Sequence, residues 1–399
     1  MNRAAVSTRL RMLIALCVGI VAALPVLGAQ AKVAEPTKPV KLDVPYVPTE
    51  DEVVEAMLKL AKVTSADYVF DLGCGDGRIV VAAAKKYKAR AFGVDIDPQR
   101  IAESNENAKK AGVTDRVKFK LGDIMVTDVH EASVVTLFLL DSVNRKLRPR
   151  LLNQLNPGVR VVSHAFSMGD WKPEKVVRHP KAFAKVLYLW IVPARAGGTW
   201  TWKTKTAGGE VANTLKLEQE FQTVKGTLGS PGGAEVPIAE ASLNGKTLRF
   251  TATPRIGGKE VKIAYQGTVE GDAIQGTQKW MTGPSAGTHP WAAKRDRVDI
   301  AGRWQIKALR HANADGTLSI QRKNGALRAT YARDQARRKR EAPVPDFCAW
   351  GASIRFELSS RGSSLIFCGT LAADAGEGTV SRTADGKATP WSAKRLAEK

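Results

Sequence analysis

The chain has 399 residues, of which 44% are hydrophobic, and a formal net charge of +22 at pH 7. The excess of lysine and arginine is spread along the sequence, which excludes a single basic tail as the source of the charge. A surface of this kind favours anionic partners.

The first 31 residues have the pattern of a secretory signal peptide. Three arginines precede an apolar run over residues 12–27, and Ala29-Gln30-Ala31 follows it. The run is shorter than the roughly 20 apolar residues that a membrane-spanning helix needs. We expect cleavage after Ala31, which would leave a linker at residues 32–43 and a periplasmic or secreted protein. An uncleaved segment that anchors the chain in a membrane is the alternative.

A strand, a glycine-rich turn and a helix are predicted around residue 70. The apolar run Tyr68-Val69-Phe70 leads into DLGCGDGR at residues 71–78, and a helical pattern covers residues 79–86. Glycines tolerate positive φ and have no side chain to block a ligand, so such a turn lets the backbone approach a nucleoside. The dinucleotide fingerprint is G-x-G-x-x-G. This chain has G-x-G-x-G after a strand-terminal Asp71, which favours S-adenosylmethionine over NAD.

Two later strand patterns also end in carboxylates. The strand at residues 90–94 ends at Asp95, which can accept hydrogen bonds from both ribose hydroxyls. The strand pattern at residues 117–121 is followed by Gly122-Asp123. Three successive predicted strands thus end at or just before a carboxylate, namely Asp71, Asp95 and Asp123, and this order predicts a nucleoside site. The alternative is a doubly wound α/β domain with unoccupied glycine turns.

Residues 44–193 resemble the class I, seven-strand S-adenosylmethionine-dependent methyltransferases. The segments YVPT at 46–49, VVTLFLLDSVN at 134–144 and VVSHAF at 161–166 make this stretch similar to the small protein lysine methyltransferases of archaea and mitochondria. The resemblance implies a Rossmann-like domain that binds S-adenosylmethionine, with the 46–49 segment closing over the cofactor. The implied cofactor-binding residues are Tyr46, Thr49, Asp71, Gly73, Gly75, Asp76, Gly77, Asp95 and Asp123.

The resemblance also nominates Phe138, Asp141 and Asn144 for the methyl-transfer site. Such a transfer mainly requires alignment of nucleophile, methyl and sulfur, so no metal site is expected. A carboxylate can orient a lysine amine as it loses its proton, and Asp141 is the candidate. Capping of a helix that begins near Ser142 is an equal alternative for Asp141. Family members often have a carboxylate where this chain has Ala165. This difference affects the assignment of the methyl acceptor more than the assignment of the cofactor.

From Gly197 onward, short alternating segments separated by glycine, asparagine and aspartate predict antiparallel β structure. The pattern repeats at an offset of about 100 residues, so PWAAKR at 290–295 matches PWSAKR at 390–395. We expect two tandem β modules, module 1 at 197–296 and module 2 at 300–397. Each has enough strands for a small barrel or sandwich, with its opening and closing tryptophans where the first and last strands meet.

Two features of the β modules leave alternatives open. Cys348 and Cys368 could form a disulfide or remain thiols. The basic run at residues 333–340 reads as a solvated hairpin loop or as a contact with anionic envelope lipid or polysaccharide, and nucleic acid is not favoured. The modules themselves could be targeting domains or bulk domains that space the enzyme.

The sequence thus predicts an exported or envelope-associated S-adenosylmethionine-dependent methyltransferase followed by two antiparallel β modules. Lysine side chains of proteins are the favoured acceptors. A small-molecule or lipid N- or O-methyltransferase is one alternative, and a non-catalytic envelope-binding protein is another. The sequence does not indicate the oligomeric state.

Overall fold

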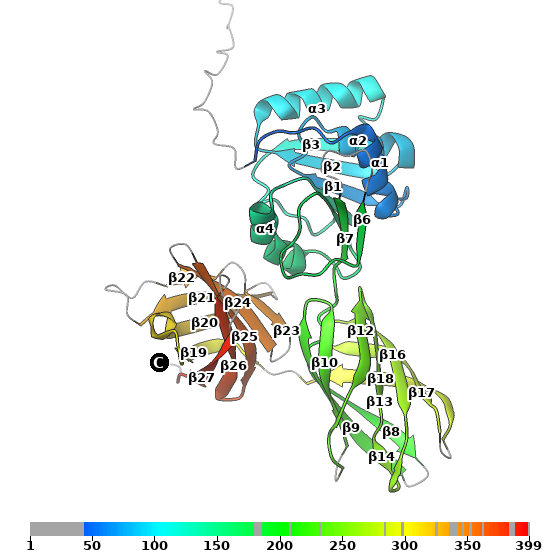
Figure 1. Cartoon of the computed structure of the whole chain (residues 1–399), viewed down its shortest axis with the longest axis vertical. Helices are drawn as coiled ribbons and strands as arrows, with labels where there is room; N and C mark the ends of the chain where they lie inside the picture. Colours follow the sequence, from blue (N-terminus) through cyan, green and yellow to red (C-terminus); the bar gives the residue numbers. More distant parts are fainter. Residues whose placement is uncertain are drawn as a thin grey trace, which may run out of the picture. The chain divides into compact units, whose positions relative to one another are not determined.

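The computed structural model (Figure 1) describes most of the chain beyond residue 43. The described residues are 44–178, 186–206, 209–230, 233–282, 285–296, 299–323, 326–334, 341–344, 347–350, 353–360, 363–382 and 388–397. The expected signal peptide, the linker and residues 335–340 of the basic run lie outside them. No helix in these ranges is long and apolar enough to cross a membrane.

The first domain is a mixed sheet with helices, as expected for a Rossmann-like fold. Its described strands form one seven-stranded sheet in the order β3-β2-β1-β4-β5-β7-β6. Neighbours from β3 to β5 are parallel, whereas β7 runs antiparallel to both β5 and β6. The helices are α1 (Asp51–Leu60), α2 (Arg78–Tyr87), α3 (Pro98–Ala111) and α4 (Asp141–Gln154). The strands are β1 (Tyr68–Leu72), β2 (Arg90–Asp95), β3 (Val117–Leu121), β4 (Val134–Leu137), β5 (Arg160–His164), β6 (Lys175–Arg178) and β7 (Val186–Ile191).

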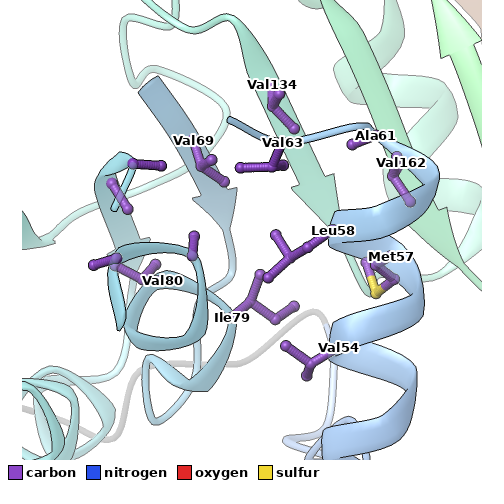
Figure 2. Packing of buried hydrophobic residues seen from close by; sticks show 14 of the residues in the cluster. Val54, Met57, Leu58, Ala61, Val63, Val69, Ile79, Val80, Val134 and Val162 are labelled. Atoms are coloured by element: carbon purple, nitrogen blue, oxygen red, sulfur yellow. The ribbon is translucent and has the colours of Figure 1, made fainter. Parts of the chain in front are cut away.

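Helix α1 is held in place by its apolar face. Acidic residues in its first turn and Lys59 in its last turn suit the helix dipole. Met57 and Leu58 are fully buried and belong to one core cluster with Val69 of β1 and Ile79 of α2 (Figure 2). Burying a side chain of this size contributes about 1.5–3 kcal/mol. The cluster therefore holds β1 and the start of α2 together, and with them the glycine-rich turn between these two elements.

The parallel strands also decide where the site lies. Because β1, β2, β3 and β4 run in the same direction, their carboxyl ends meet at one edge of the sheet. In doubly wound sheets, ligands bind outside this edge. Asp71, Asp95 and Asp123 all lie at it or just past it. The expected clustering of strand-end carboxylates is therefore present.

Modules 1 and 2 are both antiparallel β structures. In each, nine of the described strands form one sheet in which the first strand along the chain pairs with the last. In module 1, β14 and β15 form a separate two-stranded sheet. Module 1 contains β8 (Gly198–Thr206), β9 (Gly209–Glu220), β10 (Thr223–Gly229), β11 (Val236–Pro237), β12 (Ala239–Asn244), β13 (Thr247–Ala252), β14 (Arg255–Ile256), β15 (Lys259–Glu260), β16 (Ile263–Glu270), β17 (Ala273–Trp280) and β18 (Gly287–Arg295). Module 2 contains β19 (Gly302–Ala308), η1 (Ala312–Ala314), β20 (Gly316–Lys323), β21 (Ala326–Arg333), β22 (Ala342–Pro343), β23 (Cys348–Trp350), β24 (Ser353–Ser360), β25 (Ser363–Ala372), β26 (Ala375–Arg382) and β27 (Ala388–Arg395).

The sheet of module 1 curls into a barrel-like form, since β10 also contacts β12 near the other end of the strand order. Trp200 and Trp304 lie on the first strands of the two modules, opposite Arg295 and Arg395 of the last strands. Each arginine stacks on its tryptophan, with the guanidinium carbon 4.3 Å and 5.0 Å from the ring centroid. The first and last strands therefore meet at these tryptophans, as expected. The domain boundaries and the duplication itself stay predictions.

Cys348 and Cys368 do not form a disulfide. Both residues are in register with Arg355, which lies on β24 between their strands β23 and β25. The Cα atoms of the two cysteines are therefore separated by two strand spacings, which is about 9.5 Å. A disulfide needs Cα atoms within about 7 Å of each other. The alternative of two thiols is therefore the observed one.

Candidate active site

The glycine-rich turn between β1 and α2 depends on left-handed backbone conformations. Gly73, Gly75 and Gly77 have φ values of 82°, 54° and 77°, which side chains rarely adopt. The backbone N–H groups of Gly73 and Cys74 both donate to the carbonyl of Val94, at 2.8 and 3.0 Å. The turn is therefore held against the end of β2.

Asp95 has the geometry expected of a ribose ligand. Its Oδ2 accepts a 2.8 Å hydrogen bond from the backbone N–H of Gly75, and its Oδ1 accepts a 3.0 Å bond from that of Asp97. The side chain is only partly buried. Since each carboxylate oxygen can accept a further bond, both remain able to bind the two hydroxyls of a ribose.

The 46–49 segment lies over the turn. A Cβ atom placed on Gly75 would come within 2.6 Å of Cε2 of Tyr46. The guanidinium of Arg100 lies 4.4 Å from the centroid of the Tyr46 ring. Nη1 of Arg78 donates a 2.8 Å hydrogen bond to the carbonyl of Thr49. The side chain of Thr49 is itself buried, so its observed contact is through the backbone.

Arg78 is a site residue that the sequence did not single out. Its Nη2 lies 2.8 Å from Oδ2 of Asp76, and its Nε lies 3.0 Å from Oδ1 of the same carboxylate. Burial raises the pKa of Asp76, but the hydrogen bonds and charge of Arg78 outweigh it, so the net shift is downward. Asp76 is therefore ionised, and Arg78 connects it to Thr49. The sequence signal that could have identified this residue is its position directly after Gly77, the last glycine of the turn.

Asp71 and Cys74 lie beneath the turn rather than on its surface. Asp71 is 2% exposed and accepts a 2.7 Å hydrogen bond from the hydroxyl of Thr136. Burial raises the pKa of Asp71 to about 7, and the nearby carboxylates of Asp95 and Asp76 act in the same direction. Burial also raises the pKa of the Cys74 thiol, and Cys74 packs in a core cluster of the domain. A direct cofactor contact by Asp71 stays a prediction.

The end of β3 provides an exposed carboxylate and an apolar surface. Oδ1 of Asp123 accepts a 2.7 Å hydrogen bond from the backbone N–H of Met125, and Gly122 donates to the carbonyl of Asp95. Ile96 and Leu121 are 40% and 52% exposed and directly follow Asp95 and precede Gly122, respectively. The sequence reasoning missed both, although an isoleucine directly after Asp95 was visible. Their faces can pack on a flat base.

Asp141 does not cap α4, so the helix-cap alternative is wrong. The N-cap residue is Leu140, and no side chain caps the helix. Oδ1 of Asp141 instead accepts two 2.7 Å hydrogen bonds, from the backbone N–H and the hydroxyl of Ser167. Asp141 therefore connects the start of α4 to the loop that follows β5. Nearby, the Phe138 ring lies 4.1 Å from that of the buried His164.

Asn144 and Arg148 hold that same loop from beneath. Asn144 is 0% exposed, and its Nδ2 lies 3.2 to 3.3 Å from the hydroxyl of Ser163 and from the carbonyls of Phe166 and Ser167. Arg148, also buried, donates a 2.7 Å bond to the carbonyl of Met168. The structure thus places Asp141 and Phe138 at the partly exposed surface and keeps Asn144 in the interior. Nothing local in the sequence marked Arg148.

The comparisons with known proteins match this domain. The model of the ANTKMT methyltransferase domain matches residues 71–175. A protein-lysine N-methyltransferase from Saccharolobus islandicus is 49% identical over 151 residues, which are 37% of this chain and 94% of that protein. This chain belongs to the ANTKMT methyltransferase family. S-adenosylmethionine is accordingly the cofactor of this methyltransferase, and the glycine turn and Asp95 fit its nucleoside.

The chain is also similar to two further proteins. The adenine nucleotide translocase lysine N-methyltransferase of Mus musculus is 34% identical over 139 residues, which are 35% of this chain and 60% of that protein. The crystal structure of an RNA methyltransferase from Salinibacter ruber with S-adenosyl-L-homocysteine is 49% identical and covers 37% of this chain and 94% of that chain, with a TM-score of 0.36.

Proposed function

We propose that the methyltransferase transfers methyl groups to lysine side chains of proteins. The observation that carries this proposal is the 49% identity to the Saccharolobus islandicus protein-lysine N-methyltransferase over 94% of its length. The mouse relative, named for lysine methylation of the adenine nucleotide translocase, supports the same acceptor class.

When bound, S-adenosylmethionine would supply a methyl group on a positively charged sulfur. The lysine ammonium first loses one proton, and the neutral amine then accepts the methyl group and becomes a methylammonium. The chain's own residues hold and align the reactants. Asp95 binds the ribose, and the turn at Gly73, Gly75 and Gly77 lets the backbone approach the rest of the cofactor. Tyr46, which packs on Gly75, excludes water from this side.

Asp141 is the residue that orients the amine in this proposal. Its Oδ1 is occupied by the two hydrogen bonds from Ser167. No hydrogen bond to its Oδ2 is found among the described residues, so this oxygen can accept one from the amine and take the released proton. Phe138 provides an apolar wall beside it, and Asn144 positions the loop that carries Ser167.

The test uses cofactor with a radiolabelled methyl group and an extract of the cells that encode the chain. We expect label in protein, removed by protease but not by ribonuclease or lipid extraction, and located on lysine by mass spectrometry. Prior chemical acetylation of the lysines in the extract, which turns each amine into a non-nucleophilic amide, should abolish incorporation. Label that is lost to ribonuclease or that follows the lipid fraction would overturn the lysine assignment.

Export is a second part of the proposal, and it is supported by residues 1–31 of the sequence alone. The cleaved signal peptide would place the mature chain, from Lys32 onward, in the periplasm or outside the cell. Residues 1–43 fused to a phosphatase that is active only after export should yield active enzyme. Mass spectrometry of the chain's own N-terminus separates cleavage after Ala31 from an uncleaved anchor, and phosphatase activity that stays absent would refute export.

A further inference from the structure

Module 1 contains a cavity that methyl transfer does not use. Its volume is about 370 Å³, within the usual range of about 300–1,000 Å³ for small-molecule sites. The mouths of β-barrels are a common place for such sites. The lining is largely apolar and includes Val211, Leu228, Ile263, Tyr265 and Trp280.

Trp280 gives this cavity an unused hydrogen-bond donor. The residue lines the cavity and is 7% exposed, and its indole Nε1 has no hydrogen-bond partner within the described chain. Trp202 and Gln278, two other buried residues of the module, also leave side-chain atoms without partners there, Nε1 and Oε1 respectively. Buried polar groups in native proteins are almost always hydrogen-bonded, so an unpaired donor on a residue that lines a cavity indicates a ligand there.

Strand register shows that the fold itself does not require these polar groups. Gly276 pairs with Trp291 in module 1, as Gly378 pairs with Trp391 in module 2, which makes these two pairs equivalent. On this register module 2 has Val380 in place of Gln278, Phe367 in place of Tyr265 and Arg382 in place of Trp280. Trp200 and Trp304 are also equivalent, because the Nε1 atom of each donates to the backbone carbonyl of the residue four positions earlier. This equivalence places Ile306 of module 2 at the position of Trp202.

Module 2 therefore fills the corresponding interior with hydrocarbon. Val380, Phe367 and Ile306 are all fully buried. At the positions of Trp202 and Gln278 the buried polar atoms are therefore a property of module 1 alone, whereas Arg382, at the position of Trp280, is exposed. The desolvation cost of Nε1 of Trp202 and Oε1 of Gln278 is not offset by bonds within the described protein.

The rim of the cavity indicates the charge of the ligand. Arg255 and Glu260 line it, on the paired strands β14 and β15. The Arg255 Nε atom lies 3.8 Å from Oε1 of Glu260, and both side chains are more than two-thirds exposed. Since the two charges compensate each other in water, the rim does not select an ion.

We propose that module 1 binds a small, uncharged and mainly apolar molecule with one carbonyl-type oxygen. The oxygen accepts the hydrogen bond that Nε1 of Trp280 donates, and the hydrocarbon part packs on Leu228, Ile263 and Tyr265. The proposal does not depend on the methyl acceptor, since it concerns the β module only.

Two probes of nearly equal shape test the hydrogen bond, namely 2-acetylnaphthalene and 2-ethylnaphthalene. Calorimetric titration into the full chain should show the acetyl compound binding about tenfold more tightly, because only it offers an acceptor. In Trp280→Phe both compounds should bind with the weaker affinity. Lys279→Ala, an exposed position on the same strand, should keep the preference.

A cavity-filling variant separates the cavity from surface adsorption. Leu228→Trp should abolish binding of both compounds, while circular dichroism and thermal melting verify that each variant is folded. Three results would each overturn the proposal: no saturable binding by the folded wild-type chain, an equal preference for the acetyl compound in Trp280→Phe, or unchanged binding in Leu228→Trp.

Discussion

The carboxylate of Asp95 accepts a 2.8 Å hydrogen bond from the backbone N–H of Gly75, which lies 20 residues earlier in the sequence. The bond joins the glycine-rich turn after β1 to the acidic end of β2. It orders the backbone of the turn next to the carboxylate that we predict to bind the ribose. The same carboxylate thus both shapes the turn and offers its remaining acceptor sites to a ligand.

Asp95→Ala should weaken binding of S-adenosylmethionine by about 100-fold, because two charge-assisted hydrogen bonds at about 1.5 kcal/mol each are lost. Asp95→Asn, which keeps one acceptor oxygen, should fall between this variant and the wild type. Calorimetric titration measures both. Asp128→Ala removes an exposed carboxylate elsewhere in the domain and is the control. Binding by Asp95→Ala within twofold of wild type would exclude the ribose role.

Arg78→Lys should loosen the 46–49 segment. An ammonium lacks the planar fork that contacts both Asp76 and the carbonyl of Thr49. Hydrogen exchange at residues 46–49 should become faster, and the cofactor should dissociate about tenfold faster, which is the loss of one hydrogen bond. Arg116→Lys, at an exposed arginine, is the matched control. Unchanged exchange in Arg78→Lys would show that the arginine does not hold the segment.

Gly75→Ala should disrupt the cofactor site beyond the strain of its backbone. A left-handed alanine costs about 1–2 kcal/mol. Gly112→Ala measures that cost alone, because the φ of Gly112 is 67° and a Cβ atom added there would meet nothing within 4 Å. A Cβ atom on Gly75 would in addition meet the Tyr46 ring at 2.6 Å. Denaturant unfolding should show a loss of about 1–2 kcal/mol for Gly112→Ala, with cofactor binding intact. Gly75→Ala should lose binding, and equal behaviour of the two variants would contradict the contact with Tyr46.

The sequence predicted those parts of the site that depend on local patterns. Asp95 and the three glycines are recognisable because strand ends and positive φ have local signatures. The helix predicted over residues 79–86 is observed as α2, Arg78–Tyr87. The contacts of Asp141 and Asn144 with β5 and the loop after it depend on residues 19 to 26 positions away, which no periodicity encodes. The choice between barrel and sandwich also required the long-range pairing of the first and last strands.

The stability of the folded chain should fall as the pH rises towards neutrality because of Asp71. The pKa of this carboxyl is about 7 in the folded chain against an ordinary value of 3.8. Below about pH 4 both states are protonated; between about 4 and 7 only the folded state keeps its proton. The free energy of unfolding should therefore decrease with pH there, at up to about 1.4 kcal/mol per pH unit.

Asp71→Asn should remove this contribution, which urea unfolding at several pH values from 5 to 8 would measure. Asp67→Asn is the control, because hydrogen bonds to Ser133, Thr64 and Arg160 outweigh burial and lower the pKa of Asp67. Its stabilising effect is present above its unfolded pKa and is lost only at lower pH. A slope that persists unchanged in Asp71→Asn would assign the pH dependence to other groups.

Asp141→Asn separates a chemical role of this carboxylate from a structural one. The amide oxygen can still accept the hydrogen bonds from Ser167, so the loop after β5 should keep its place. The amide cannot take a proton, however, and loss of a general base lowers kcat by about 10²–10⁴-fold. We expect this loss with unchanged affinity for S-adenosylmethionine. Asn144→Ala leaves Asp141 intact but removes the bonds that hold the loop, so it should raise the KM for the acceptor more than it lowers kcat. If Asp141→Asn keeps full activity, the carboxylate only positions the loop, and the proton must leave to water.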